Sequence, residues 1–217
     1  MPELEYMDAF FEKRIGDYDE HMLGDVEGCR EGYEVMAQLV PQSAKTLLDL
    51  GCGTGLELDA IFRRLPDLAV TGIDMTQAML DRLREKHPGK QLRLICGDYF
   101  KTDFGIARFD CAVSFETMHH FSPADKLGLY KRLCASIKDS GVYLECDYMV
   151  GTQIEEDHHF AVYEKLRREQ NIPADVFCHY DTPCTVDKQI SLLTEAGFKS
   201  VEKVFCIGNT VMLSAKK

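Results

Sequence analysis

Apolar positions follow two different periods along the middle of the chain. Short runs rich in apolar residues predict buried strands over 46–50, 68–73, 91–96, 109–115 and 141–148. Between these runs, apolar residues recur at helical spacing and predict helices over 56–65, 76–86 and 123–137. Strands that alternate with helices in this way are typical of parallel βαβ units. The pattern therefore predicts an α/β domain built on a mostly parallel sheet.

The N-terminal part departs from this rhythm. Residues 1–40 look helical and carry several aromatic side chains ahead of the first sheet strand. We expect them to form a helical lid over the sheet edge or over the carboxyl ends of its strands.

The C-terminal third departs from the rhythm as well. Residues 151–184 hold a charged helix and then an irregular piece, which predicts a cap inserted after the fifth strand. Residues 185–217 hold a helix over 186–196 and two strands that flank Gly208-Asn209. A two-residue connection makes such a strand pair antiparallel. The chain is thus predicted to be one domain over 1–217, with the sheet core in 43–150.

Composition narrows the class of protein. The 217 residues are 45% hydrophobic, which suits a globular domain with a sizeable core. Lys and Arg number 25 against 36 Asp and Glu, so the formal charge of −11 disfavours broad binding to nucleic acid. It does not exclude a local basic pocket.

The remaining composition bears on location. The longest stretch without Asp, Glu, Lys or Arg, Val204–Ala215, is too short to span a membrane, and the acidic start does not resemble a signal peptide. Nine cysteines without a Cys-x-x-Cys pair predict reduced thiols and a cytoplasmic protein.

A glycine-rich loop follows the first predicted strand. Gly51, Gly53 and Gly55 stand between that strand and a helix, where residues without Cβ permit a tight turn and close approach of a ligand. The dinucleotide fingerprint needs a glycine at its sixth position, and Leu56 stands there. The loop therefore disfavours a nicotinamide-dependent oxidoreductase.

Two acids follow at the ends of the next two strands. Asp74 could accept both hydroxyls of a ribose, because a carboxylate has two acceptor oxygens, and Asp98 could accept from an adenine amino group. Either acid alone is equally well explained as a turn or helix cap. The ordered set of loop, acid and acid at one sheet edge is much more specific.

With these residues the chain resembles the class I S-adenosylmethionine-dependent methyltransferases, over roughly residues 43–150. The resemblance implies a Rossmann-like three-layer αβα sandwich whose seven-stranded mixed sheet ends in the antiparallel pair. It implies S-adenosyl-L-methionine as the cofactor, with S-adenosyl-L-homocysteine as the product.

The same resemblance assigns residues to the cofactor. The aminoacyl part of the cofactor would be surrounded by Asp49, Gly51, Gly53 and Gly55. Its ribose hydroxyls would be bound by Asp74. Met75, Asp98 and Tyr99 would lie near the adenine, and Phe115 and Glu116 near the methionine moiety and the methyl group.

The motif Thr117–Phe121 after the fourth strand resembles the small-molecule branch of this family. In that branch an N-terminal helical segment often closes over the cofactor, and Tyr18 is a local candidate for this contact, with Phe10, His21 and Met22.

Methyl transfer from a sulfonium is an in-line displacement, which needs alignment and exclusion of water. A general base is needed only for an alcohol, a phenol or a protonated amine. His119 and His120 are the candidate bases, and Glu116 is a candidate to bind the cofactor's amino group or the acceptor. The alternative is that one histidine packs under the cap while the other faces solvent.

No metal ion is predicted. His158, His159 and His179 could join His119 and His120 as ligands, but no spacing matches an established motif. The metal-dependent catechol-type enzymes carry Asp after the fourth strand and Asp-Asn after the fifth, where this chain has Glu116 and Asp147-Tyr148. Four cap aromatics could line an acceptor pocket: Phe160, Tyr163, Phe177 and Tyr180. The helical spacing of Phe160, Tyr163 and Leu166 equally fits a packed stripe.

The sequence thus predicts a cytoplasmic methyltransferase, monomeric or homodimeric, that acts on a small molecule at oxygen, nitrogen or carbon. Two alternatives stay open: an enzyme of the same fold that acts on RNA or protein, and a catalytically inactive S-adenosylmethionine-binding protein. Nothing in the sequence names the acceptor.

Overall fold

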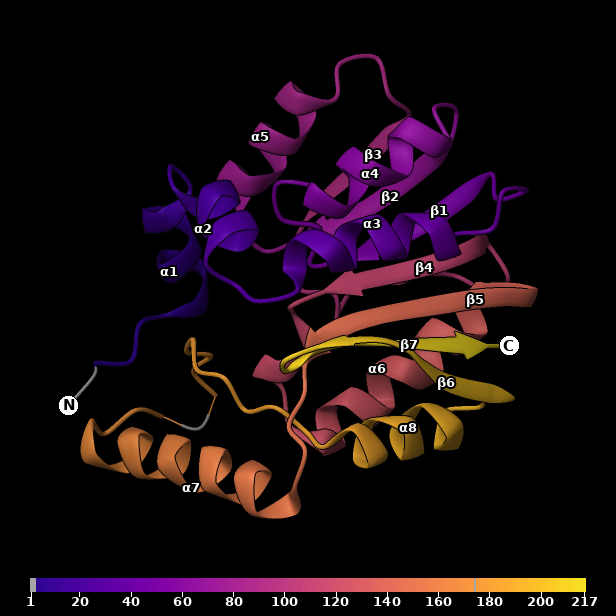
Figure 1. The fold of residues 1–217 in the computed structure, drawn as a ribbon. Coiled ribbons are helices and arrows are strands. Elements are labelled where there is room, and N and C mark those ends of the chain that lie inside the picture. Colours follow the sequence, from indigo (N-terminus) through magenta and orange to yellow (C-terminus); the bar gives the residue numbers. More distant parts are fainter. Residues whose placement is uncertain (1–2, 174) are drawn as a thin grey trace.

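A single seven-stranded sheet organises the molecule. The computed structural model describes residues 3–173 and 175–217 (Figure 1), so residues 1 and 2 of the predicted lid and residue 174 of the predicted cap lie outside it. The strands run in the order β3-β2-β1-β4-β5-β7-β6. They are β1 (Thr46–Leu50), β2 (Ala69–Asp74), β3 (Leu92–Cys96), β4 (Phe109–Phe115), β5 (Ile137–Tyr148), β6 (Ser200–Ile207) and β7 (Thr210–Lys216). The first five are parallel and β7 is antiparallel to both neighbours, which confirms the predicted mixed sheet.

Helices cover both faces of the sheet, which completes the predicted αβα sandwich. One core contains side chains of α3 (Cys29–Leu39), α4 (Leu56–Arg64) and α5 (Gln77–Lys86). The other contains side chains of α6 (Pro123–Ser136) and α8 (Val186–Glu195). The short helices α1 (Met7–Arg14) and α2 (Tyr18–Gly24), the 3₁₀ turn η1 (Met118–His120) and the long helix α7 (Gln153–Glu169) complete the chain.

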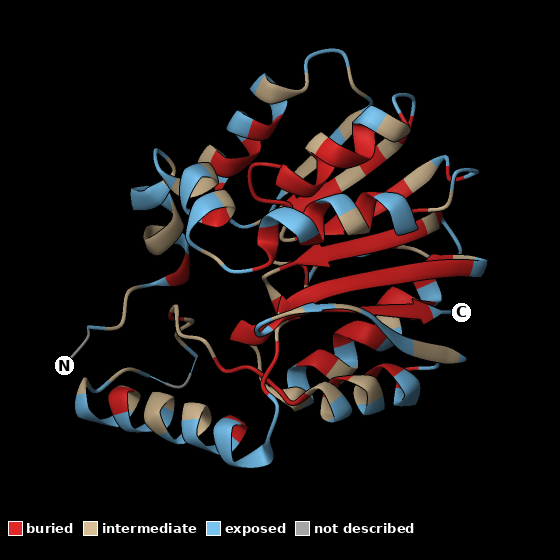
Figure 2. Cartoon of the chain, viewed as in Figure 1, coloured by how far each residue is buried: buried red, intermediate tan, exposed pale blue. Residues whose placement is uncertain are grey.

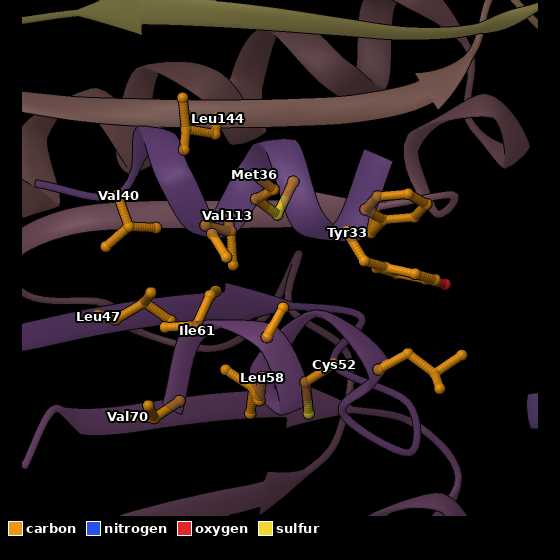
Figure 3. Packing of buried hydrophobic residues seen from close by; sticks show 14 of the residues in the cluster. Tyr33, Met36, Val40, Leu47, Cys52, Leu58, Ile61, Val70, Val113 and Leu144 are labelled. Carbon is orange, nitrogen blue, oxygen red and sulfur yellow. The ribbon is translucent and has the colours of Figure 1, made fainter. Parts of the chain in front are cut away.

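Alternation along the central strands explains why their apolar runs are nearly continuous. In β4, Cys111 and Val113 enter the core under α3 and α4, whereas Phe109 and Ala112 enter the core under α6 and α8. A strand covered on both faces has no position left for a solvated side chain. The central strands are accordingly buried (Figure 2), and Figure 3 shows Met36 of α3 packed in the first of these cores.

Two predicted boundaries shift. Helix α6 ends at Ser136 and β5 begins at Ile137, because the backbone there already pairs with Phe109 of β4. Ser122 caps α6 by accepting the amide hydrogen of Asp125. Thr76 occupies the N-cap position of α5, without a side-chain cap bond.

The predicted lid divides into two parts. Helix α3 packs against α4 and belongs to a layer of the sandwich, whereas α1 and α2 lie beyond the carboxyl ends of the parallel strands (Figure 1). The N-terminal segment is tied to the cap, because the Met7 amide donates to Phe177 O and the His179 amide donates to Glu5 O. Lid and cap therefore form one cover. Within the described ranges, no helix has the length and apolar run needed to cross a membrane.

Candidate active site

The loop between β1 and α4 forms a cradle of exposed backbone. Gly51 and Gly53 have φ of +69° and +46°, which side chains with Cβ adopt at a cost. A Cβ on Gly51 would also come within 2.5 Å of Thr117 Oγ1. The loop leads into the N-terminus of α4, where backbone amides lack helical partners. Both features suit close contact with a ligand.

Asp74 joins this loop to the end of β2. One carboxylate oxygen accepts the amide hydrogen of Gly53 at 2.9 Å, and the other accepts that of Thr76 at 2.8 Å. Burial raises the pKa of Asp74, and these two hydrogen bonds oppose that rise. The carboxylate thus holds the loop in place and keeps lone pairs that a hydroxyl-bearing ligand could use.

A cavity of about 490 Å³ opens beside the loop; we call it the inner cavity. Helices α1 and α2 contribute Met7, Phe11 and Tyr18 to its wall, and the cap contributes Phe177. Nine residues assigned to the cofactor line it: Tyr18, Gly51, Gly53, Asp74, Met75, Asp98, Tyr99, Phe115 and Glu116. The structure therefore brings together residues from five separate segments of the sequence.

Asp49 and Gly55 line neither this cavity nor the one described below. Asp49 is buried behind the loop, and its carboxylate oxygens have no hydrogen-bond partner in the described part of the chain. Burial, with Glu57 close by, raises the pKa of Asp49 well above its usual value. Because neither residue lines a cavity, their direct contact with the cofactor stays a prediction, and their position suits shaping of the loop from behind.

A second and larger cavity, of about 1200 Å³, adjoins the first; we call it the outer chamber. Its wall combines residues of α1, α2, η1, the end of β5, the cap and the β6–β7 turn. Four residues line both cavities and mark the junction between them: Phe11, Tyr18, Glu116 and His120.

His119 lies beside this junction with both ring nitrogens engaged. Its Nδ1 is 2.5 Å from Asp147 Oδ1, and its Nε2 is 3.4 Å from Asp181 Oδ1. Burial disfavours a charged imidazole, but the carboxylates of Asp147 and then Asp181 outweigh it and raise the pKa of His119 well above its usual value. The hydrogen bond to Asp147 fixes Nδ1 as a donor and turns Nε2 toward the outer chamber.

His120 has the opposite electrostatic environment. Burial, and then the charge on His119, lower the pKa of His120 well below its usual value, so this imidazole is neutral at pH 7. Its Nδ1 lies 3.3 Å from the carbonyl oxygen of Tyr180. The two neighbouring histidines are both buried and neither faces bulk solvent, contrary to the alternative considered from the sequence.

Glu116 holds an uncommon backbone conformation, with φ of +48° for a residue that is not glycine. Strain of this kind collects at functional sites and is held by the surrounding structure. The Glu116 amide donates to Cys146 O at 2.8 Å, which fixes the turn out of β4. Burial raises the pKa of Glu116 to about 8, and the neighbouring charge of His119 opposes this rise.

Two acids of this cluster have partners that the sequence did not identify. Asp147 ends β5, and because β5 neighbours β4, its closeness to His119 could have been inferred from the strand order. Asp181 is remote from His119 along the chain, and no sequence signal joins them. Thr182 holds that segment in place by donating its amide hydrogen to His119 O at 2.8 Å.

The other cap residues have smaller parts. Only Phe177 of the four cap aromatics lines a cavity, and Tyr163 stacks on Tyr180 with ring centroids 5.2 Å apart. Leu166 is buried and Phe160 and Tyr163 are half-buried, which suits the packed-stripe alternative. His159 contacts the Tyr148 hydroxyl at 3.3 Å and lines neither cavity.

Potential metal ligands do come together, in the sets His119-His120-Asp181 and Glu116-His119-Asp147, each within 4.8 Å. His119 belongs to both sets and already contacts an acid through each nitrogen. Hydrogen-bonded ion pairs account for this arrangement, and the absence of a metal ion stays a prediction.

Comparison with known proteins agrees with this geometry. A family model described as a methyltransferase domain matches residues 47–141. A carboxy-S-adenosyl-L-methionine synthase of Wolinella succinogenes is 27% identical over 99% of this chain and 95% of its own length. A malonyl-acyl-carrier-protein O-methyltransferase of Acetivibrio thermocellus is 28% identical over 66% of this chain and 50% of its own length.

Solved structures share the fold. An O-methyltransferase family protein from Burkholderia thailandensis aligns with a TM-score of 0.72 at 15% identity, over 98% of this chain and 63% of that one. Human N-acetylserotonin methyltransferase in complex with S-adenosylmethionine aligns with a TM-score of 0.64 at 17% identity, over 88% of this chain and 52% of that one. This chain therefore spans less than two thirds of either structure.

The glycine cradle and Asp74 fit the cofactor of such enzymes, since a side chain at Gly51 would obstruct the loop that the ligand contacts. Its sheet order, its matched domain and its relatives together support a class I S-adenosylmethionine-dependent methyltransferase.

Proposed function

We propose that this methyltransferase acts on a small molecule held in the outer chamber. The observation that carries the proposal is the pair of adjoining cavities, with the His119–Asp147 pair beside their junction. A cofactor in one cavity and an acceptor in the other would meet at Glu116 and His120. Such an arrangement holds two reactants in line and keeps water away from them.

The inner cavity would hold S-adenosylmethionine, which supplies an electrophilic methyl group on a sulfonium when bound. Gly51 and Gly53 would contact its aminoacyl part, and Asp74 would accept from its ribose hydroxyls. Asp98 and Met75, on the rim of the same cavity, would flank its adenine. Tyr18 and Phe11 would close the cavity from above, because both belong to the cover formed by lid and cap.

His119 would act as the general base for the acceptor. Asp147 holds the proton on Nδ1, so the neutral imidazole presents the lone pair of Nε2 toward the outer chamber. Asp147 also makes Nε2 more basic, since a carboxylate stabilises the imidazolium that forms. His120, neutral and at the junction, would position the acceptor.

Two observations favour a small acceptor over RNA or protein. Parts of α1, α2 and the cap surround the chamber, and carboxylates dominate its charged lining. Carboxylates repel a phosphate backbone, which disfavours a nucleic-acid acceptor. The carboxy-S-adenosyl-L-methionine synthases, which match over most of the chain, suggest a second candidate: synthesis of a carboxylated derivative of the cofactor.

The test has two stages. Calorimetry should first show binding of S-adenosylmethionine. The protein is then incubated with methyl-labelled S-adenosylmethionine and, separately, with a small-molecule metabolite extract, total RNA or total protein. Label should enter only the small-molecule fraction. Label in RNA or protein would contradict the proposal, and binding without transfer to any of the three would favour an inactive binding protein. Appearance of carboxy-S-adenosylmethionine by mass spectrometry would favour the second candidate.

A further inference from the structure

The outer chamber has a strongly one-sided charge. Six acidic side chains contribute to its wall, five of them besides the protonatable Glu116, and Arg14 is the one lysine or arginine among its lining residues in the described chain. The carboxylates come from three parts of the fold: Asp17, Glu20, Asp25 and Glu27 from the region of α2, Glu116 after β4, and Asp181 in the cap.

Arg14 is already committed within the protein. Its Nη2 donates to Glu5 at 2.9 Å, its Nη1 donates to Phe10 O at 2.9 Å, and its guanidinium lies 3.6 Å from the centre of the Phe10 ring. A guanidinium with these partners has lost much of its capacity to bind a carboxylate or phosphate on a ligand.

The imidazoles do not restore a binding site for an anion. His119 stands between Asp147 and Asp181, and His21 is 3.0 Å from Asp25. Each of these rings therefore has an acid of the protein as its partner. The chamber keeps a surplus of negative charge that a cationic ligand would neutralise.

Aromatic rings form much of the remaining wall. Phe11, Tyr18 and Tyr148 line the chamber alongside the acids. Aromatic faces attract ammonium groups, and the attraction grows when the ammonium leaves water. Carboxylates combined with ring faces suit an organic cation better than they suit a neutral alcohol or an acid.

We infer that the acceptor is a small cationic amine, bound as an ammonium and methylated on nitrogen. The inference rests on the proposed function and names the acceptor class of the same site. Asp181, beside His119, is the carboxylate at this end of the chamber, and it would draw the ammonium group toward the point where the two cavities meet. Glu116 lines both cavities, and its carboxyl group, whose pKa is raised to about 8, would accept a hydrogen bond from the ammonium there.

The transfer is balanced with the groups present. His119 first loses its own proton to solvent. The ammonium then gives one proton to Nε2 of the neutral imidazole and becomes a neutral amine. The nitrogen lone pair then forms a bond to the methyl carbon while the bond from that carbon to sulfur breaks, and its electron pair stays on sulfur. The products are a methylated ammonium and S-adenosylhomocysteine, and the proton on His119 returns to solvent.

The same chemistry separates this chain from the synthases that it resembles. Their name describes a product that carries a carboxyl group. A free cation is the strongest partner for a carboxylate, and the outer chamber offers no free lysine or arginine among the described residues that line it. We therefore expect the chamber to reject acids.

Charge fractionation of a metabolite extract tests the inference. The extract is divided into molecules retained on cation exchanger, molecules retained on anion exchanger, and neutral flow-through. Each is given to the full chain with labelled S-adenosylmethionine. Label should enter the cation-exchange fraction alone. Label in the anionic or neutral fraction would overturn the amine assignment and leave the proposed function intact. No label in any fraction would overturn both.

Binding without turnover gives an independent readout. Each fraction is added together with S-adenosylhomocysteine, and the Tm of the protein is measured. Only the cation-exchange fraction should raise the Tm, because a ligand stabilises the state that binds it. A rise with the anionic fraction, and none with the cationic one, would contradict the inference.

A matched pair of variants then tests the charge itself. Glu20 and Glu27 line the chamber, whereas Glu31 is an exposed acid of α3 that does not. With the purified acceptor, the double variant E20Q/E27Q should raise KM by about 3- to 10-fold at low salt with kcat unchanged, since it removes attraction in a partly solvated site. E31Q should leave KM unchanged. Equal KM values for E20Q/E27Q and the parent would show that these two carboxylates do not contribute to acceptor binding.

Discussion

The inner cavity and the outer chamber differ in where their walls come from. Most of the inner cavity is built by residues inside the matched domain, 47–141. In the outer chamber, Glu116, His119 and His120 are the only lining residues from that domain; the rest come from the lid, the end of β5, the cap and the β6–β7 turn.

The inner cavity and the outer chamber also differ in the groups that they offer to a ligand. The inner cavity uses backbone and strand-end acids whose geometry follows from the glycine loop and the sheet order. The outer chamber uses side chains brought together from distant segments, such as Asp181 against His119. A family resemblance based on the first region therefore identifies the cofactor and is silent on the acceptor. Each prediction below affects one region and leaves the other as its control.

The largest effect is expected at His119. Replacing His119 by Asn should lower kcat by about 10²- to 10⁴-fold, the range typical for loss of a general base. Calorimetry should show the same affinity for S-adenosylmethionine, because His119 lines only the outer chamber. The matched variant His120→Asn should cost less. A larger loss of kcat in the His120 variant than in the His119 variant would show that His120, and not His119, is the general base.

The pH profile should follow His119. Its pKa is raised, so the imidazole is mostly protonated at neutral pH and must lose its proton to act as a base. With saturating acceptor, kcat should rise with pH by up to about tenfold per unit until His119 is neutral. Glu116, Asp147, Asp181 and His120 all face this ring.

Asp147→Asn provides the control for that profile. It removes the carboxylate that raises the pKa of His119 most, so the rising limb should move to lower pH while maximal kcat falls. If the rising limb of the pH profile does not move in this variant, a group other than His119 controls the increase of kcat with pH.

A smaller effect is expected in the inner cavity. Asp74→Ala should weaken binding of S-adenosylmethionine at least about tenfold, from a loss of about 1.5–3 kcal/mol for hydrogen bonds to a charged group. Because Asp74 also holds Gly53 and Thr76, a thermal melt must confirm that the variant is folded. KM for the acceptor should stay within about twofold. Unchanged cofactor affinity would refute the assignment of Asp74 to the ribose.

The smallest effect concerns the cap alone. Thr152 begins α7 with a capping box, in which its hydroxyl accepts from the Glu155 amide and the Glu155 carboxylate accepts from the Thr152 amide. Thr152→Ala should lower the free energy of unfolding by about 1 kcal/mol, measured by urea denaturation. Cofactor affinity should not change. A weakened cofactor affinity would show that the cap and the inner cavity are more tightly coupled than their separate walls suggest.

The sequence by itself determined the sandwich and the cofactor edge. The two hydrophobic periods located all seven strands, and the strand 109–115 agrees in full with β4. Gly51 and Gly53 were identifiable because positive φ is a local property of the backbone, and Asp74 because it ends a buried strand. These signals depend only on residues that are neighbours in the sequence, so they can be recognised without knowledge of the rest of the fold.

Only the tertiary structure decided the rest. It placed α3 in a sheet layer instead of the lid, put Asp49 behind the glycine loop, and set Asp181 opposite His119. It also joined the first helices to the cap through Glu5 and His179. Such contacts depend on how separate elements pack, and neither periodicity nor propensity records which distant side chains will meet. The outer chamber is made almost entirely of such contacts, which is why the sequence named a cofactor but no acceptor.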